Sequence, residues 1–468
     1  MTVQLKNIGI IKQAEFSLGD LTIICGENNT GKTYTSCVLY SFLRSWPELI
    51  HFSISDVQIL HLFTEGTPIK VKLPQKTGEL LTTLCHNYTS RLDTVFAAPE
   101  GTFQNSEFCV LKNDINIRDI RELHSRVEHP QLSYFVVSKH KQSDEIAITV
   151  EEKKPEVTID SALIKITKQM IDKIIAAIIF WGVFPNPFIS TAERTGITTF
   201  RKELDSAWHR RFAEFRFSQS DPNIDPGELL VKPLQNYPSS IEANMEWTRR
   251  LEEIAKNKSF IAKEHPEVLE DFSDIVGGEY AITQNDQLYF IPKDTQTKLT
   301  MVESSSVVRS LLDLSFFLRC SAKKGDVLMI DEPELSLHPE NQRRIARLFA
   351  RLVNLGVKVF ITTHSDYIIK ELNTLIMLNH DKPHLKAIAK ANGYQENELI
   401  KAEQVKVYVA EKALMPLEEG QKKRRRAHTL VSADIDPEFG IEVGSFDKTI
   451  DTMNKIQRDI VWGAKQDK

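Results

Sequence analysis

Hydrophobic and polar positions divide the chain into stretches of different period. Val3–Ile11 and Leu21–Cys25 are short apolar or alternating runs, which predict two strands, with Ala14–Phe16 continuing the first. Gly19-Asp20 marks a turn between them. Ala162–Trp181 carries apolar residues at helical spacing, so we expect an amphipathic core helix there.

The second half of the chain changes period twice. Residues 200–275 are charged and follow a helical pattern, which predicts a helical arm inserted into the core. Tyr280–Thr283, Gln287–Ile291 and Leu299–Val302 then predict short strands that lead into a helix at Ser306–Lys323. Together with the parallel strands described below, this pattern predicts an α/β fold.

The apolar run Leu21–Cys25 ends in a glycine-rich turn that is followed by a helical pattern. This is G-x-x-x-x-G-K-T in the required context of strand, turn and helix, which indicates a phosphate-binding loop (P-loop). The candidate nucleotide-binding residues are Gly26, Glu27, Asn28, Asn29, Thr30, Gly31, Lys32, Thr33 and Tyr34. Lys32 would reach the β- and γ-phosphates of ATP, and the Thr33 hydroxyl would bind Mg²⁺. The alternative is a glycine- and asparagine-rich turn with a lysine by chance.

A second apolar strand, Val327–Ile330, ends in the carboxylates Asp331 and Glu332. We expect Asp331 to hold Mg²⁺ and Glu332 to polarise the attacking water. The buried strand Val357–Thr363 ends at His364, 33 positions after Asp331, which is enough for one strand–helix–strand crossover in a parallel sheet. The carboxyl ends of parallel strands bind ligands, so His364 would contact the γ-phosphate; a core histidine is the alternative.

Composition limits the remaining classes of function. The 468 residues are 41% hydrophobic and 26% charged, with a net charge of −5, so nothing in the overall charge favours nucleic acid. The longest apolar run, Ile174–Phe184, is too short to span a bilayer, and no signal peptide is visible at the N-terminus. The five cysteines are scattered without metal-binding pairs. We therefore expect a cytoplasmic protein without a membrane partner.

Four segments together resemble a known family. Gly26–Thr33, Asp331–Pro333, Leu335–Pro339 and Thr363–Ser365 resemble the ABC-type ATPase heads of the RecF, SMC and OLD group. The resemblance implies an ABC-type head: a mixed sheet lobe and a parallel core sheet with flanking helices, here with an inserted helical arm and a small α+β C-terminal tail. It implies ATP and Mg²⁺ as cofactors and ATP hydrolysis as the activity, with Lys32, Glu332 and His364 as catalytic residues.

The same resemblance implies a dimer. In such heads the segment Ser304–Ser306 would be the signature, with Ser305 and Ser306 meeting the γ-phosphate bound by a second protomer. Two nucleotides would then be sandwiched between subunits, with Glu334–His338 crossing between the sites. Val307 departs from the glycine that relatives carry, and its branched side chain obstructs close approach of the backbone to phosphate. A serine-rich helix N-cap is the alternative for this segment.

The resemblance also divides the chain. The predicted domains are 1–199 (lobe I with the P-loop and a β-rich insertion), 200–278 (helical arm), 279–380 (lobe II with the signature, the acid pair and the switch histidine) and 381–468 (α+β tail for partner or oligomer contacts). Residues 191–194 occupy the place of the loop that senses nucleotide in relatives, and neither Glu193 nor Arg194 receives a role.

The tail decides which member of the group is expected. Val405–Glu411 and Asp434–Asp436 could supply the acids of a TOPRIM nuclease, but too few residues separate them for a crossover helix. Carboxylates that cap a turn before Pro437 explain them better. A head without its own nuclease resembles the ATPase subunits of bacterial anti-phage systems, first PARIS and second Septu. That resemblance implies a homo-oligomer, a separate nuclease or toxin effector of TOPRIM type, and a phage-encoded trigger protein.

Other functions stay open at this point. A RecF-like DNA-repair clamp that closes on duplex DNA is the main alternative, and a nucleotide-binding structural subunit is a third. The run Lys422, Lys423, Arg424, Arg425 and Arg426 places five positive charges together. It is either a solvated loop between two strands or a site for DNA, or for a protein that imitates DNA.

Overall fold

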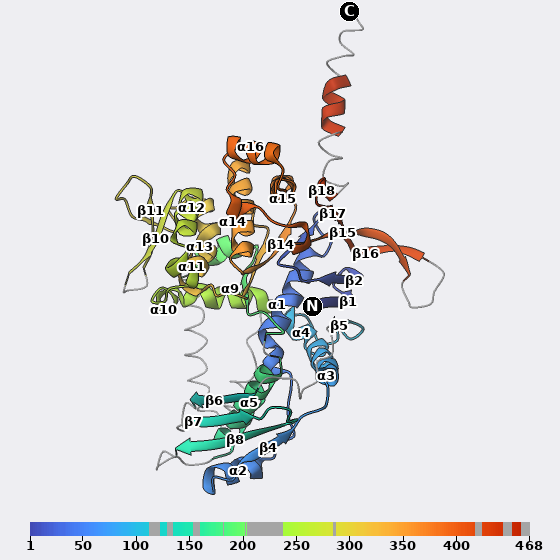
Figure 1. Ribbon diagram of the computed structural model, residues 1–468, viewed down its shortest axis with the longest axis vertical. Coiled ribbons are helices and arrows are strands. Elements are labelled where there is room, and N and C mark those ends of the chain that lie inside the picture. The colour runs from blue at the N-terminus through green and yellow to red at the C-terminus, as the bar shows by residue number, and fades with distance from the viewer. Residues whose placement is uncertain are drawn as a thin grey trace, which may run out of the picture. The chain divides into compact units, whose positions relative to one another are not determined.

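The computed structural model describes residues 1–111, 122–128, 134–152, 160–180, 182–201, 203, 237–283, 287–416, 424–442 and 452–459. The chain forms two compact units (Figure 1). Unit 1 comprises residues 1–6, 41–92 and 103–185, and unit 2 comprises residues 7–40, 93–102 and 186–468. Because the predicted segment 200–278 includes many residues outside the described ranges, the four-domain division stays a prediction.

Unit 1 contains a four-stranded antiparallel sheet with helices. Its sheet has the order β4-β8-β7-β6. The elements are β4 (Ile69–Lys72), β5 (Glu107–Leu111), β6 (Leu123–Glu128), β7 (Tyr134–Lys139), β8 (Glu145–Glu152), α2 (Asp56–Thr64), α3 (Thr77–Thr89), α5 (Ser161–Ile179) and the short helix η1 (Trp46–Glu48). Strand β1 (Thr2–Ile8) pairs antiparallel with β5. Helix α5 agrees with the predicted core helix, and Ile171, Ile175 and Ile179 on its apolar face are buried.

Unit 2 is built on a mixed sheet that contains the P-loop strand. Its strands lie in the order β2-β16-β15-β3-β14-β13-β9. These are β2 (Ile11–Ser17), β3 (Leu21–Cys25), β9 (Pro187–Ser190), β13 (Val327–Asp331), β14 (Lys358–Thr363), β15 (Val405–Pro416) and β16 (Arg424–Ser432). From β15 to β9 all neighbours are parallel. The crossover predicted between Asp331 and His364 is therefore confirmed.

Helices and two small sheets complete unit 2. The helices are α6 (Arg194–Thr199), α9 (Ser239–Arg249), α10 (Leu251–Ile254), α11 (Phe260–Glu264), α12 (Pro266–Val276), α13 (Ser306–Phe316), α14 (Pro339–Asn354), α15 (Asp366–Met377), α16 (Pro383–Ala391) and the short η4 (Glu396–Glu398) and η5 (Ala402–Gln404). Helices α1 (Lys32–Ser45) and α4 (Leu92–Val95) each contain residues of both units. The small sheets are β10 (Gly278–Ile282), β11 (Leu288–Pro292) and β12 (Leu299–Thr300), and β17 (Asp434–Asp436) with β18 (Gly440–Glu442).

The core of unit 2 explains why its strands read as continuous apolar runs. All five residues of β3 and all five of β13 are buried, because helices cover both faces of a parallel sheet. Helix α14 makes the crossover from β13 to β14 and packs against α15. The crossover brings the carboxyl ends of β3, β13 and β14 to one edge of the sheet, since Asp331 lies opposite Thr362, and Thr363 lies opposite Cys25.

Three elements differ from the sequence pattern. The predicted strand Val3–Ile11 ends at Ile8, because Gly9 adopts a φ of +57° and turns the chain. The helix predicted over Ser306–Lys323 ends at Phe316 and continues as a single π-helical turn, η3 (Phe317–Ser321). Strands β15 and β16 from the tail join the sheet next to β3, which the sequence pattern did not indicate. In the described ranges, no helix has the length and apolarity needed to cross a membrane.

Candidate functional site

The turn after β3 has a backbone that only glycine allows at two positions. Gly26 and Gly31 adopt φ values of +138° and +101°, and Asn29 also lies in the left-handed region at +60°. A Cβ on Gly26 would lie 2.5 Å from the carbonyl oxygen of Ala410, and one on Gly31 would lie 2.6 Å from Cγ1 of Ile11. The glycines are thus required by both conformation and space, and they form a cradle suited to phosphate at the start of α1.

The side chain of Lys32 folds back onto this loop. Its Nζ donates to the carbonyl oxygens of Gly26 (2.9 Å) and Glu27 (2.8 Å), and the residue is only 6% exposed. Burial lowers the pKa of the Lys32 amine, and the nearby carboxylates Glu332 and Glu334 act against that shift. A partly desolvated amine held at the start of helix α1 fits a nucleotide's terminal phosphates.

The other loop residues surround the cradle. Glu27, Asn28, Asn29 and Thr33 are exposed, whereas Thr30 is buried and donates its hydroxyl to the Glu27 carbonyl oxygen at 2.8 Å. The exposed position of Thr33 suits its predicted role as a ligand of Mg²⁺. The ring of Tyr34 packs against that of Phe96, with centroids 5.1 Å apart, so it lies at the rim of the loop.

Asp331 lies at the end of β13 on the same edge of the sheet. It is 3% exposed and accepts a hydrogen bond from Thr362 Oγ1 at 2.9 Å. Burial raises the pKa of Asp331 to about 6, and hydrogen bonds from Ser36 and Thr362 oppose the shift. Ser36 belongs to α1, and the charge of Asp331 acts on Lys32. The structure therefore brings the loop and this acid together, as an ATP–Mg²⁺ site requires.

Glu332 follows in a strained backbone conformation. Its φ is +49°, a left-handed value that a non-glycine residue adopts only when its surroundings hold it there. Its N–H donates to the Thr362 carbonyl oxygen at 2.9 Å. Its carboxylate Oε1 lies 3.6 Å from Nδ1 of His364. The structure thus places two of the three predicted catalytic side chains, Glu332 and His364, beside one another at the strand ends.

Glu334 belongs to this cluster, although the resemblance implied for it only a place in a loop that crosses between the two nucleotide sites. Its Oε1 accepts from the His364 N–H at 2.8 Å and from Thr363 Oγ1 at 2.9 Å, and it lies 3.2 Å from His364 Nδ1. Its Oε2 is buried and has no hydrogen-bond partner among the described residues. A carboxylate with one orphaned oxygen beside Lys32 and His364 is typical of a site built for a ligand rather than for stability.

Arg194 also contacts this cluster, although it received no role from the sequence. It is 1% exposed, and its guanidinium donates to the carbonyl oxygens of Asp331 (2.6 Å) and Glu332 (2.7 Å). Burial lowers its pKa, and Asp313 is the first of the acids that oppose this shift. The sequence offered two signals: its place four residues after a strand that ends at the same edge, and the resemblance of residues 191–194 to the loop that senses nucleotide in relatives.

The candidate signature, Ser304–Ser306, lies at the start of helix α13. Ser305 is the N-cap of α13 and its side chain accepts from the Val308 N–H at 3.4 Å. Ser305 and Ser306 are both exposed, while Ser304 is buried and donates its hydroxyl to the Thr300 carbonyl oxygen at 2.7 Å. The capping role predicted as the alternative is therefore present, and contact with a second protomer stays a prediction.

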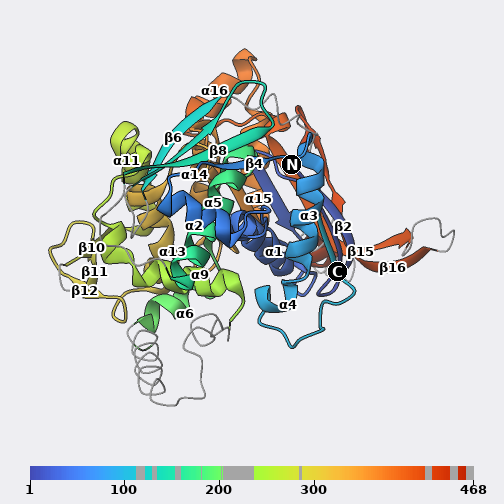
Figure 2. The same cartoon turned by 90° about the horizontal axis from the view of Figure 1, so that it is seen from below.

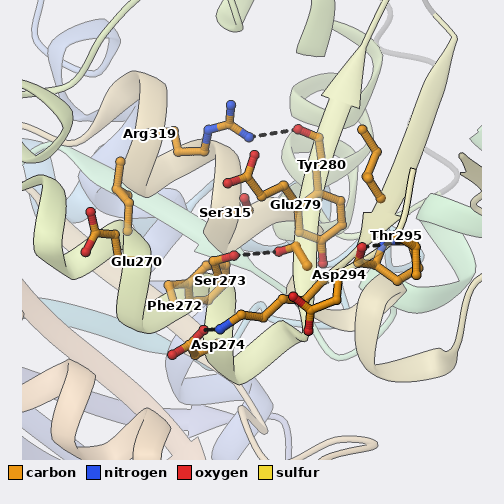
Figure 3. A pocket seen from close by; sticks show the side chains of 15 residues that line it. Glu270, Phe272, Ser273, Asp274, Glu279, Tyr280, Asp294, Thr295, Ser315 and Arg319 are labelled. Atoms are coloured by element: carbon orange, nitrogen blue, oxygen red, sulfur yellow. Dashed lines mark hydrogen bonds and ion pairs between the residues drawn. The ribbon is translucent and has the colours of Figure 1, made fainter. Parts of the chain in front are cut away.

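A cavity of about 750 Å³ in unit 2 lies apart from this cluster (Figure 3). It is lined by residues of α12, β10, β11 and η3, and none of its lining residues belongs to the loop or the acid pair. Its charged side chains are partly paired, since Lys293 contacts Asp274 at 2.8 Å and Arg319 donates to the Tyr280 carbonyl oxygen at 2.8 Å. We assign it no function.

The solved structures that are similar to this chain include heads of SMC proteins. An SMC head bound to the C-winged helix domain of ScpA is 10% identical, with 92% of this chain and 97% of that chain covered and a TM-score of 0.35. The SMC head domain from Thermotoga maritima is 9% identical, covering 93% and 98%, with a TM-score of 0.28. The SMC head from Pyrococcus furiosus, bound to the C-terminal domain of ScpA, is 12% identical, covering 97% and 98%, with a TM-score of 0.29. Because all three TM-scores are low, we infer no function from this likeness.

A family match is decisive instead. A search of curated proteins finds no match. The family model described as "AAA ATPase domain" matches residues 1–369, which include the loop, the acid pair and His364. The chain therefore belongs to the AAA ATPase domain family and is an ATPase.

Proposed function

We propose that this ATPase is the sensor and scaffold subunit of a bacterial anti-phage defence complex. It assembles as a cytoplasmic homo-oligomer through ATP-sandwich dimers and controls a separate nuclease or toxin effector, which is released when a phage protein is sensed. The observation that carries this proposal is a full set of nucleotide-site residues in a chain whose tail acids are engaged structurally. Asp436 Oδ1 accepts from the N–H groups of Glu438 (2.7 Å) and Phe439 (2.9 Å), so it caps a turn.

The tail topology supports a separate effector. A TOPRIM nuclease needs a crossover between its acidic strands, but β15 is followed by β16 in an antiparallel hairpin. Asp434 lies on the two-stranded ribbon of β17 and β18. Effector chemistry is therefore assigned to another protein, first a TOPRIM partner.

The residues of the site divide the work of hydrolysis. The loop N–H groups and Lys32 would hold the phosphates, and Thr33 and Asp331 would hold Mg²⁺. A bound magnesium ion supplies positive charge that offsets the charge developing on the transferred phosphoryl group. Glu332 accepts a proton from the attacking water, and His364, oriented by Glu334, contacts the γ-phosphate. Ser305 and Ser306 serve the site of a second protomer.

One substitution and one host assay test this proposal together. Glu332→Gln keeps the shape of the side chain but removes the base, so hydrolysis falls by about 10² or more while ATP still binds. We expect ATP-bound oligomers to accumulate, as measured by phosphate release and light scattering. In a phage-sensitive host, the gene with its genomic neighbours protects against infection, and Lys32→Ala abolishes protection.

Two outcomes would contradict this proposal. If Glu332→Gln hydrolyses ATP as fast as the parent, the assignment of the base is wrong. If the gene protects no host together with any neighbour, and duplex DNA stimulates the purified ATPase, the protein is a RecF-like clamp instead.

One observation favours that second candidate. Arg424, Arg425 and Arg426 are exposed on β16 and form no ion pair with any residue in the described ranges. Lys422 and Lys423 lie outside those ranges. The run was predicted as a loop or a binding site; its arginines lie on a strand, in a hairpin that projects from the sheet in both views (Figures 1 and 2). DNA, or a trigger protein that imitates DNA, would bind there.

The register of this hairpin places two of its three described arginines on one face. β15 pairs with β3 only from Val405 to Val409, whereas its pairing with β16 continues to Pro416. Leu414 lies opposite Arg426, and Pro416 lies opposite Arg424, so both arginines share a face of the ribbon. Two guanidinium groups on one exposed face suit adjacent phosphates of a nucleic-acid backbone.

A further inference from the structure

Arg194 is the first residue of α6 and follows the loop after β9. It is among the largest fully buried side chains of the described residues, with an exposure of 1%. A buried guanidinium is costly unless its N–H groups are all satisfied, so its partners reveal what the protein gains from it.

Its partners are backbone carbonyl oxygens from three segments. Nε donates to Ser310 in α13 at 2.9 Å. Nη1 donates to Thr191 at 2.8 Å and to Asp331 at 2.6 Å, and Nη2 donates to Glu332 at 2.7 Å. One rigid fork therefore joins the end of β9, the helix that begins at the candidate signature, and the turn that carries both acids.

The hydrogen bond to Glu332 falls where the backbone is strained. A left-handed φ at a non-glycine residue costs about 1–3 kcal/mol and persists only where neighbours determine it. Thr362 holds the N–H of Glu332, and Arg194 holds its carbonyl oxygen. The two bonds fix the backbone at both ends of the residue, and hence the direction in which its side chain leaves the backbone.

Asp313 supplies the counter-charge from the same helix as Ser310. It is 1% exposed, and its Oδ2 accepts from Asn244 Nδ2 at 2.6 Å and from Ser190 Oγ at 3.2 Å. Asn244 Oδ1 in turn accepts from the Thr191 N–H at 3.0 Å. The arginine and the aspartate are thus embedded in one buried network that spans β9, α9 and α13.

We infer that Arg194 is a positioning residue for ATP hydrolysis: it aims Glu332 and ties it to helix α13. Helix α13 begins at Ser305 and Ser306, which would meet the nucleotide of a second protomer. A shift of this helix on that contact would be transmitted to Glu332 through the guanidinium of Arg194. This inference rests on the role of Glu332 in the proposed function. It requires nothing of the effector or the trigger.

The test compares two buried arginines. Arg194→Lys keeps the charge but loses the planar fork, so it cannot hold three segments at once. We expect its kcat to fall at least about tenfold, since displacements of about 1 Å near reacting groups cost up to about 10²-fold. The dissociation constant for a fluorescent ATP analogue should change by less than about twofold, because the loop that binds the phosphates is unaltered. The matched control is Arg351→Lys: Arg351 is 3% exposed on α14 and pairs with Asp271, and its variant should keep its kcat.

A double variant separates positioning from a structural role. If Arg194 acts through Glu332, then Arg194→Lys in the Glu332→Gln background lowers kcat by no more than about twofold further. Asp313→Asn, which leaves the arginine in place without its counter-charge, gives a smaller kcat loss with unchanged nucleotide affinity. This variant decides the question if Arg194→Lys fails to fold.

Three results would overturn the inference. One is a folded Arg194→Lys protein with parental kcat; another is a kcat loss matched by an equal loss of nucleotide affinity. The third is full additivity in the double variant, or a parental kcat for Asp313→Asn if Arg194→Lys is unfolded. A Glu332→Gln variant that hydrolyses normally would instead refute the site assignment in the proposed function, so the two failures are distinguishable.

Discussion

The two halves of the candidate site are built in different ways. In the loop half, Lys32 bonds to carbonyl oxygens no more than six residues away. In the acid half, the carbonyl of Glu332 is held by Arg194, 138 residues away, and the Glu334 carboxylate accepts from the N–H of His364, 30 residues away. The loop half is thus a local structure. The acid half, called the acid edge below and formed by Asp331, Glu332, Glu334 and His364, is assembled by the tertiary fold.

The two halves should therefore respond differently to substitution. A change in the loop removes a group that binds phosphate, and no other segment supplies a replacement. A change in the acid edge alters the aim of a carboxylate that several segments hold together. We expect loop variants to abolish ATPase activity and nucleotide binding. Acid-edge variants should reduce the activity to different extents, with little change in nucleotide binding.

The largest expected effect is that of Lys32→Ala. Its amine donates to the Gly26 and Glu27 carbonyl oxygens within its own loop, so the substitution leaves the fold intact but removes the cation that binds the phosphates. We expect no measurable hydrolysis and a loss of ATP affinity of about 10² or more, measured by phosphate release and by titration with a fluorescent analogue. Lys358→Ala is the control, since Lys358 pairs with Asp20 at the start of β14, at the opposite edge of the sheet. Parental ATP affinity in Lys32→Ala would mean that the loop is not the phosphate site.

An intermediate effect is expected for Glu334→Gln. The amide keeps an oxygen for the His364 N–H, and a neutral amide costs less to bury than a carboxylate with one orphaned oxygen, so the melting temperature should hold or rise. The charge that orients His364 and acts on Lys32 is removed, and kcat should fall about tenfold. Phosphate release and thermal unfolding measure the two quantities.

The matched control for that variant is Glu371→Gln. Glu371 is also buried but pairs with Arg343 (2.7 Å) and Arg347 (2.6 Å) away from the site. Its substitution should lower the free energy of unfolding by about 1–3 kcal/mol and leave kcat unchanged. The distinction between the two carboxylates disappears if Glu334→Gln loses stability without losing activity.

The smallest effect on hydrolysis is expected from the hairpin. Replacing the five basic residues from Lys422 to Arg426 by alanine should leave basal ATPase activity within about twofold, because the described ones, Arg424–Arg426, belong to neither half of the site. If the hairpin binds DNA, affinity for a short duplex falls, and the slope of log affinity against log salt decreases by about 0.9 for each phosphate that is no longer neutralised. Lys382→Ala with Lys386→Ala is the control, since these lysines are already paired with Glu438 and Asp381. An unchanged affinity and slope would remove the hairpin from DNA recognition.

The sequence alone determined the parts of this protein that depend on neighbours along the chain. The loop from Gly26 to Thr33 was predictable because glycine conformations and the strand and helix around it are local properties. The apolar runs before Asp331 and His364 predicted buried strands, and the interval between them predicted a parallel crossover, which is confirmed. The turn cap at Asp436 was predictable for the same reason.

Only the tertiary structure decided which distant groups meet. Nothing near Arg194 in the chain indicates that its guanidinium reaches Ser310, Asp331 and Glu332, since those hydrogen bonds arise when β9, α13 and β13 pack together. The place of β15 beside β3 and the orphaned oxygen of Glu334 likewise follow from packing. Local residue order sets backbone conformation and periodicity, whereas burial and hydrogen bonding between remote segments exist only once the sheet has formed.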